Sequence, residues 1–135
     1  LNLSAAAYCA QAAIRNMKKN NIPGRIVNIS SVHGFISWVK RKMLPYCAAK
    51  GGLDAMSLPI ARGLARIGIR IAGIMPGLFE TPIYKKQETI DALMKDTVFP
   101  VRFGKPHEFA SLLLEVVRNS MINGTTIRLD GAVRF

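Results

Sequence analysis

The sequence predicts an α/β fold in which a doubly wound parallel sheet is covered by helices on both faces. Three short runs of mainly apolar residues, many of them β-branched, at 25–30, 69–75 and 125–129, have the pattern of buried strands bounded by turn residues. Segments with helical periodicity separate these runs, so helices and strands alternate along the chain. Such alternation favours parallel strands joined by right-handed crossovers.

The first helix and strand are predicted at residues 3–19 and 25–30. The helical segment is rich in alanine and ends in two lysines, which suit the negative end of a helix. A turn of Asn, Pro and Gly residues at 20–24 ends it. Residues 33–44 are expected to form a loop before the next helix.

The second helix is predicted at residues 46–66, after Pro45. Pro59 lies inside this segment and predicts a kink there. Residues 69–75 form the second buried run, and a Pro-Gly pair ends it. Residues 80–84 are expected to form a loop or a short helix.

The last third of the chain is predicted to hold two helices and one strand. Residues 86–95 are amphipathic, and Pro106 is expected to open a helix at 106–118 because proline suits a first helical turn. A tight Asn-Gly turn precedes the strand at 125–129. With 135 residues and no internal repeat, the chain is interpreted as one domain or part of one.

The composition restricts the class of function. The net charge is +11, from 19 Lys and Arg against 8 Asp and Glu, so the surface could hold a polyanion. No aromatic residues alternate with the basic clusters, which argues against a base-stacking surface for nucleic acid. Two Cys and two His without metal-ligand spacing predict no metal site. No apolar run is long enough to cross a membrane, and the sequence predicts no compartment, leaving cytoplasm and mitochondrion open.

Tyr46 and Lys50 are the pair with the clearest chemical meaning. Residues four apart lie on one face of a helix, so the phenol and the ammonium can converge. Free tyrosine has a pKa of about 10, and a nearby cation favours the phenolate. A group tuned in this way can move a proton on or off an alcohol oxygen. Such a pair also occurs by chance in basic helices, so other features of the chain have to support the assignment.

Several motifs together resemble the short-chain dehydrogenase/reductase family. They are Asn2 on the first helix, the strand end Asn28-Ile29-Ser30-Ser31, the Tyr46 and Lys50 pair, Pro76-Gly77 with Thr81, and the closing Leu129-Asp130-Gly131. The stretches around Pro59, Gly68 and Phe79 are most similar to the type-2 3-hydroxyacyl-CoA dehydrogenase subgroup. This resemblance covers essentially the whole chain and implies the C-terminal half, with about three strands, of a single Rossmann-like domain over residues 1–135.

The resemblance implies a role for four catalytic residues. Tyr46 would exchange a proton with the substrate oxygen, and Lys50 would support it and bind the nicotinamide ribose. Ser31 would donate a hydrogen bond to the same oxygen, with Ser30 as second choice. Asn2 would hold a water that links Lys50 to solvent.

The resemblance also implies a nicotinamide cofactor, NAD with NADP left open. Pro76, Gly77, Leu78, Phe79 and Thr81 would meet the nicotinamide, together with the Tyr46 and Lys50 side chains. The family's glycine-rich phosphate-binding turn would precede this segment, so most of the cofactor cradle is expected to lie outside it.

One departure from the family pattern affects the interpretation of the site. Ser31 lies fifteen residues before Tyr46, where the family usually has thirteen, and His33 occupies the usual position. We interpret this as a two-residue insertion between Trp38 and Met43, next to the substrate site. Substrate choice could therefore differ from that of relatives.

The predicted function is hydride transfer between NAD(H) and a secondary alcohol or ketone, either a 3-hydroxyacyl-CoA, as in fatty acid metabolism, or a hydroxysteroid-like compound. Association as a homodimer or homotetramer through the helices at 3–19 and 46–66 is expected from the family. Two alternatives stay open. One is a non-catalytic interaction subunit of the same fold that binds RNA, and the other is an inactive truncated product.

Overall fold

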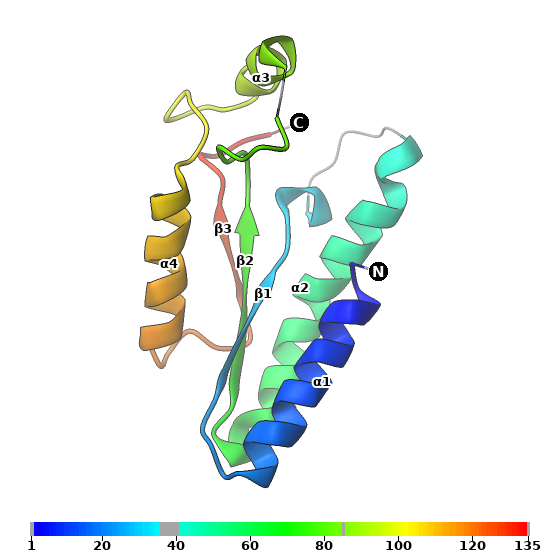
Figure 1. Cartoon of the computed structure of the whole chain (residues 1–135), viewed down its shortest axis with the longest axis vertical. Coiled ribbons are helices and arrows are strands. Elements are labelled where there is room, and N and C mark those ends of the chain that lie inside the picture. Colours follow the sequence, from blue (N-terminus) through cyan, green and yellow to red (C-terminus); the bar gives the residue numbers. More distant parts are fainter. Residues whose placement is uncertain (1, 36–40, 85, 135) are drawn as a thin grey trace.

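The computed structural model describes residues 2–35, 41–84 and 86–134, which form a three-layer arrangement of helix, sheet and helix (Figure 1). The strands β1 (Arg25–Ile29), β2 (Arg70–Pro76) and β3 (Thr126–Leu129) pair in the order β1-β2-β3, and both pairs are parallel. Because parallel strands point the same way, their carboxyl ends lie at one edge of the sheet. The predicted α/β class with parallel strands is confirmed.

Helices cover both faces of the sheet. α1 (Ser4–Lys19) and α2 (Leu44–Leu64) lie on one face, and α4 (Pro106–Arg118) lies on the other (Figure 1). The short helix α3 (Gln87–Met94) lies beyond the carboxyl ends of the strands (Figure 1). Every carboxyl-end loop therefore opens toward the same end of the molecule, where ligands of open α/β sheets bind.

Two apolar clusters hold these layers together. One joins the central strand to α4 through Ala72, Ile74 and Val116, and Ile74 is fully buried. Because helices cover both faces of β2, almost all of its residues are apolar. The other cluster lies beyond the strand ends and is built from the buried residues Val32, Met75, Leu78, Phe103 and Val133. This second cluster forms the floor of the loops that carry the candidate site.

The element boundaries agree with the sequence predictions to within two residues, and the largest differences are at the two ends of α2. This helix begins at Leu44, so Pro45 lies in its first turn instead of preceding it. A proline is tolerated there because the first helical N–H groups have no intrahelical acceptor. The helix also continues through Pro59 as far as Leu64, so this proline does not end the helix.

The segment predicted as a loop at 33–44 contains two short 3-10 turns. They are η1 (Val32–Gly34) and η2 (Arg41–Met43). Most of the expected two-residue insertion, including Trp38, lies outside the described residues.

Candidate active site

The Tyr46 and Lys50 side chains meet on one face of α2. Lys50 Nζ lies 5.8 Å from the centroid of the Tyr46 ring. The ammonium also donates a hydrogen bond of 2.8 Å to the carbonyl of Ile29, the last residue of β1. Burial lowers the pKa of Lys50, and the nearby Asp54 carboxylate acts in the opposite direction. The start of α2 is thus held directly against the end of the first strand.

Ser31 lies on the loop that leaves β1, two residues before His33. It caps η1, and its Oγ accepts a hydrogen bond of 3.3 Å from the His33 backbone N–H. The His33 ring packs edge-on against the Tyr46 ring, with 6.3 Å between the centroids. This contact brings the Ser31 segment and the Tyr46 phenol to the same part of the site.

The two neighbouring serines differ in what their hydroxyl groups do. Ser30 Oγ contacts the Asp54 carboxylate at 2.8 Å and the Lys50 carbonyl at 3.1 Å, so its proton is already engaged. Within the described residues, no acceptor is found for the hydroxyl proton of Ser31. This geometry favours Ser31 over Ser30 as the donor to a substrate oxygen.

The loop after β2 borders a cavity together with the start of α4. Pro76, Gly77, Phe79 and Thr81 line a cavity of about 330 Å³, which Tyr84 also borders. A volume of this size lies within the range of small-molecule pockets. Of the seven residues predicted to meet the nicotinamide, four border this cavity, whereas Leu78, Tyr46 and Lys50 do not.

Leu78 is placed differently from its neighbours. Its side chain is buried in the cluster beneath the loop, and its carbonyl accepts a hydrogen bond of 2.8 Å from the Gly104 backbone N–H. It therefore supports the wall from behind and does not border the cavity that Thr81 lines.

Gly77 is required by close packing against the third strand. Its N–H donates to the Leu129 carbonyl at 2.9 Å, and a Cβ added at this position would lie 2.7 Å from Asp130 Cβ. This contact joins the loop after β2 to the Leu129-Asp130-Gly131 segment. The Pro76-Gly77 and Leu129-Asp130-Gly131 motifs, which are distant in sequence, therefore lie side by side.

Tyr84 is a residue of the site that the sequence analysis did not select. It borders the cavity of about 330 Å³ described above. It also borders a second cavity of about 480 Å³, which Ile90, Met94 and Phe103 help to line. Burial raises the pKa of the Tyr84 phenol, and the nearby Tyr46 phenol adds to this effect. No periodicity or motif marks Tyr84, because only the path of the loop brings it close to Tyr46.

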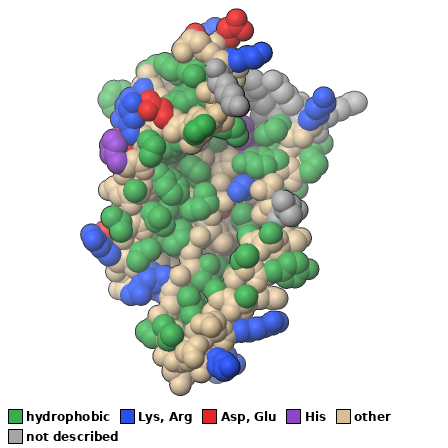
Figure 2. Space-filling view, viewed as in Figure 1, with side chains coloured by type: hydrophobic (Ala, Val, Ile, Leu, Met, Phe, Trp, Pro, Cys, Tyr) green, Lys and Arg blue, Asp and Glu red, His purple; other side chains and the backbone are tan. Residues whose placement is uncertain are grey.

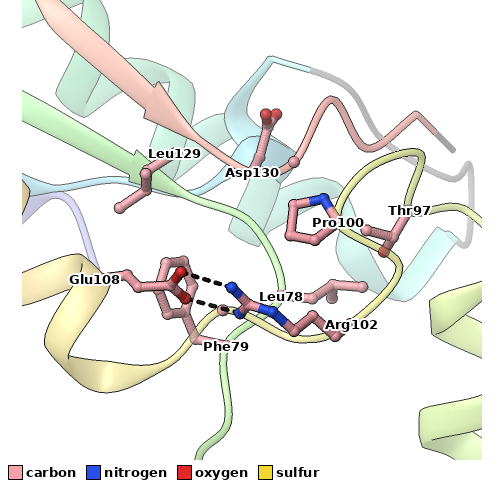
Figure 3. Close-up of a pocket in the computed structure, with 10 residues that line it drawn as sticks. Leu78, Phe79, Thr97, Pro100, Arg102, Glu108, Leu129 and Asp130 are labelled. Carbon is pink, nitrogen blue, oxygen red and sulfur yellow. Dashed lines mark hydrogen bonds and ion pairs between the residues drawn. The ribbon is translucent and has the colours of Figure 1, made fainter.

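A smaller cavity of about 110 Å³ lies behind the loop, and Figure 3 shows its lining. There the Arg102 guanidinium and the Glu108 carboxylate point toward each other and form an ion pair of 2.7 Å. Glu108 also accepts from the Lys105 backbone N–H, and these contacts lower its pKa to about 2. The pair fixes the start of α4 to the turn that precedes it. We therefore interpret the residues around this cavity as structural and not as part of the active site.

Asn2 is exposed and lies just before Leu3. The Leu3 side chain approaches Gly52 of α2 closely enough that a Cβ there would lie 3.1 Å from it. No hydrogen bond between Asn2 and Lys50 is found among the described contacts. The structure therefore places Asn2 near the helix that carries Lys50, and its role stays a prediction.

Gly51 lets the Ser31 loop approach α2. A Cβ on Gly51 would lie 2.9 Å from the Gly34 carbonyl oxygen, whereas one on Gly63 of the same helix would meet nothing within 4 Å. We expect Gly51→Ala to displace the loop and to destabilise the full-length protein, in which this segment is folded, by about 1–3 kcal/mol. Gly63→Ala is the matched control, and it should stabilise by about 0.4–1 kcal/mol because alanine favours a helix. Urea denaturation of both variants measures the difference, and equal effects would contradict the close packing.

Comparison with known proteins agrees with this geometry. The sequence profile of the short chain dehydrogenase family matches residues 1–91. The chain belongs to the short-chain dehydrogenase family. The resemblance inferred from the motifs is thereby confirmed.

Relatives of this short-chain dehydrogenase chain include 3-hydroxyacyl-CoA dehydrogenase type-2 from Mus musculus, with 44% identity over 114 residues, covering 83% of this chain and 43% of that protein. Glucose 1-dehydrogenase 2 from Bacillus subtilis is 34% identical over 139 residues, which cover 98% of this chain and 52% of that protein. The chain thus spans about half the length of the curated relatives it matches, or less.

Solved structures show the same fold. The crystal structure of 3-hydroxyacyl-CoA dehydrogenase type-2 from Mycobacterium avium has a TM-score of 0.76 at 37% identity, covering 83% of this chain and 43% of that one. 4-Hydroxyisoleucine dehydrogenase complexed with NADH and succinate has a TM-score of 0.84 at 23% identity, covering 96% and 54%. Family membership and fold therefore agree, and the second comparison bears on the fold alone.

Two further observations concern metals and membranes. Across the described parts of the chain, no group of three or more His, Cys, Asp or Glu side chains could hold a metal ion. Within the same residues, no helix has the length and apolar character needed to span a bilayer.

Proposed function

We propose that this chain forms the catalytic part of an oxidoreductase that transfers hydride between NAD(H) and a secondary alcohol or ketone. The observation that carries this proposal is the convergence of three elements at the carboxyl edge of the sheet. α2 brings Tyr46 and Lys50, and the loop after β1 brings Ser31 and His33, whose ring packs on Tyr46. The segment after β2 brings Tyr84 close to Tyr46 and borders a cavity that is closed on its other side by Pro106 and Phe109 of α4. A site of this kind fits proton exchange at one oxygen atom.

The proposed chemistry follows from the donors present. Tyr46 gives a proton to the ketone oxygen in reduction and takes it back in oxidation. Ser31 donates a hydrogen bond to the same oxygen and stabilises the negative charge that develops there. The Lys50 ammonium lies 5.8 Å from the centroid of the Tyr46 ring, where its charge can attract negative charge that develops on the reacting oxygens.

The cofactor would occupy the cavity bordered by Pro76, Gly77, Phe79 and Thr81. The fit is supported by the close packing of Gly77 on Asp130, which keeps this wall free of a side chain at that position. When bound, a nicotinamide ring supplies or accepts the hydride, and the protein positions it. Thr81 would bind the carboxamide, and Lys50 the ribose. We propose NAD as the cofactor and leave NADP open.

The substrate class is proposed from the second cavity. Ile90, Met94 and Phe103 line it beside Tyr84, and such apolar side chains suit the hydrocarbon part of an acyl chain or of a steroid-like compound. The relatives named 3-hydroxyacyl-CoA dehydrogenase favour a 3-hydroxyacyl-CoA ester, and with it a place in fatty acid metabolism. A hydroxysteroid-like alcohol is the alternative substrate.

Association through α1 and α2 is part of the proposal. Large apolar side chains stand exposed on these helices, including Tyr8 at 69% and Leu58 at 56% of their accessible surface. A second copy could cover them, as a homodimer or a homotetramer. β1 is an edge strand, because among the described strands it pairs with β2 alone. Its free edge could also hydrogen-bond to another strand.

One experiment tests the function directly. The full-length protein that contains this chain is incubated with NAD and a 3-hydroxyacyl-CoA, and NADH is followed by absorbance. We expect turnover with this substrate, whereas the 135-residue chain alone should not bind NADH tightly in a fluorescence titration, because most of the phosphate-binding part lies outside it. Micromolar binding of NADH to the 135-residue chain alone would contradict the expectation that most of the cofactor-binding residues lie outside it.

A non-catalytic subunit that binds RNA is the second candidate, and the net charge of +11 favours it. Figure 2 shows Lys and Arg spread over the visible face of the molecule instead of forming one continuous patch. Acidic side chains on this face gather mainly toward the end that carries α3 (Figure 2). A salt-sensitive RNA complex without dehydrogenase activity would support this alternative over the enzyme.

A further inference from the structure

Asp54 lies one helical turn after Lys50 on α2 and faces the end of β1. Its Oδ2 accepts a hydrogen bond of 2.8 Å from Ser30 Oγ, the residue next to Ser31. Ser30 is almost completely buried, and its hydroxyl also contacts the Lys50 carbonyl at 3.1 Å. One buried hydroxyl therefore ties the Ser31 segment to the turn of the helix that holds Lys50.

We propose that Asp54 is a positioning residue of the candidate active site, which holds Ser31 in register with Tyr46 through Ser30 and keeps a negative charge beneath the Lys50 ammonium. This inference rests on the proposed function, because it assigns Asp54 to the organisation of the same site. No motif used in the sequence analysis includes Asp54.

The second carboxylate oxygen supports an electrostatic role. Asp54 Oδ1 is buried and has no hydrogen-bond partner among the described residues. A buried charged oxygen without a partner is costly, so a compensating charge nearby is expected. The Lys50 ammonium provides that charge without an ion pair, because no contact of 4 Å or less joins the two groups in the described structure. Asp54 thus acts on Lys50 across a gap, and not by binding it.

The groups around Lys50 come from three elements. α2 contributes the Tyr46 phenol and the Asp54 carboxylate, β1 contributes the Ile29 carbonyl, and η1 contributes His33, whose ring packs on Tyr46. Asp54 is the group in this set that opposes the effect of burial on the pKa of Lys50. Removing its charge should make the ammonium lose its proton more readily.

The first test is Asp54→Asn in the full-length protein. Asparagine keeps the shape and one acceptor oxygen for Ser30, removes the charge and replaces the other oxygen with an NH₂ group. We expect the titration midpoint of the Lys50 side chain, followed by NMR of ¹³C-labelled lysine, to move to lower pH. Asp91→Asn on α3, whose carboxylate bonds only to Gln87 among the described contacts, is the matched control and should leave the midpoint unchanged. An unchanged midpoint in Asp54→Asn would overturn the electrostatic part of the proposal.

The second test is Ser30→Ala, which removes the hydroxyl that links Asp54 to the Ser31 segment. Because a misplacement of about 1 Å can cost about 100-fold in rate, we expect kcat to fall by about 10- to 100-fold while the KM for NAD stays within about twofold. Unchanged kcat would overturn the positioning part. The NMR titration needs no turnover, so an inactive wild-type protein with a shifted Lys50 midpoint would reject the proposed function and leave the effect of Asp54 on Lys50 standing.

Discussion

Tyr46→Phe in the full-length protein is expected to abolish NADH production from a secondary alcohol. Phenylalanine keeps the ring that packs against His33 and lies near Lys50, so the fold should be retained. It removes the only atom of this side chain that can exchange a proton. General acid–base catalysis contributes about 100- to 10,000-fold, so we expect kcat to fall by about that factor.

Tyr8→Phe is the control for this experiment. Tyr8 lies on α1, on the surface proposed to contact a second copy, and phenylalanine keeps the apolar ring there, so this change should leave kcat unaltered. Near-normal turnover in Tyr46→Phe would remove the basis for the catalytic assignment. Equal losses in both variants would indicate a general effect of removing a phenol.

Arg70→Met is expected to cause the largest loss of stability of any single substitution on the surface of the sheet. The Arg70 guanidinium, at the start of β2, donates to four backbone carbonyls around the end of α4. These acceptors are Val116 at 3.4 Å, Val117 at 2.9 Å, Asn119 at 3.0 Å and Ile122 at 2.6 Å. The positive charge also suits the negative end of the helix. Several charged hydrogen bonds are lost together, so we expect the free energy of unfolding of the full-length protein to fall by about 2–4 kcal/mol.

Arg118→Met is the matched control, since Arg118 lies in the last turn of the same helix and is exposed. Its loss should cost less than about 1 kcal/mol, as is usual for a single charge at a helix end. Urea denaturation of the two variants gives the comparison. Similar losses would show that net charge, and not the four carbonyl contacts, accounts for the effect of Arg70.

The fold could be predicted from the sequence because its signals are local. Apolar β-branched runs between turns identified the strands, and proline and glycine identified most helix ends. The start of α2 was missed because Leu44 and Pro45 resemble a loop when the first helical turn is not considered. The prediction that helices cover both faces needed only the alternation of elements.

The candidate site could be predicted only in part. Tyr46 and Lys50 follow from helical spacing, but contacts made through space leave no periodic signal. Tyr84, Asp54 and the edge-on contact of His33 depend on how loops and helix turns meet. The preference for Ser31 over Ser30 came from the family resemblance, and the hydrogen bonds of Ser30 to Asp54 and Lys50 add a physical reason for it.

A crystal structure of the full-length protein with NADH and a 3-oxoacyl thioester tests the central claim most directly. The proposed mechanism predicts that the ketone oxygen accepts hydrogen bonds of about 3 Å or less from both Tyr46 Oη and Ser31 Oγ. It also predicts that the nicotinamide lies against the Pro76–Thr81 wall. A ketone oxygen bound away from the Tyr46 phenol, or a nicotinamide on the far side of the loop, would contradict it.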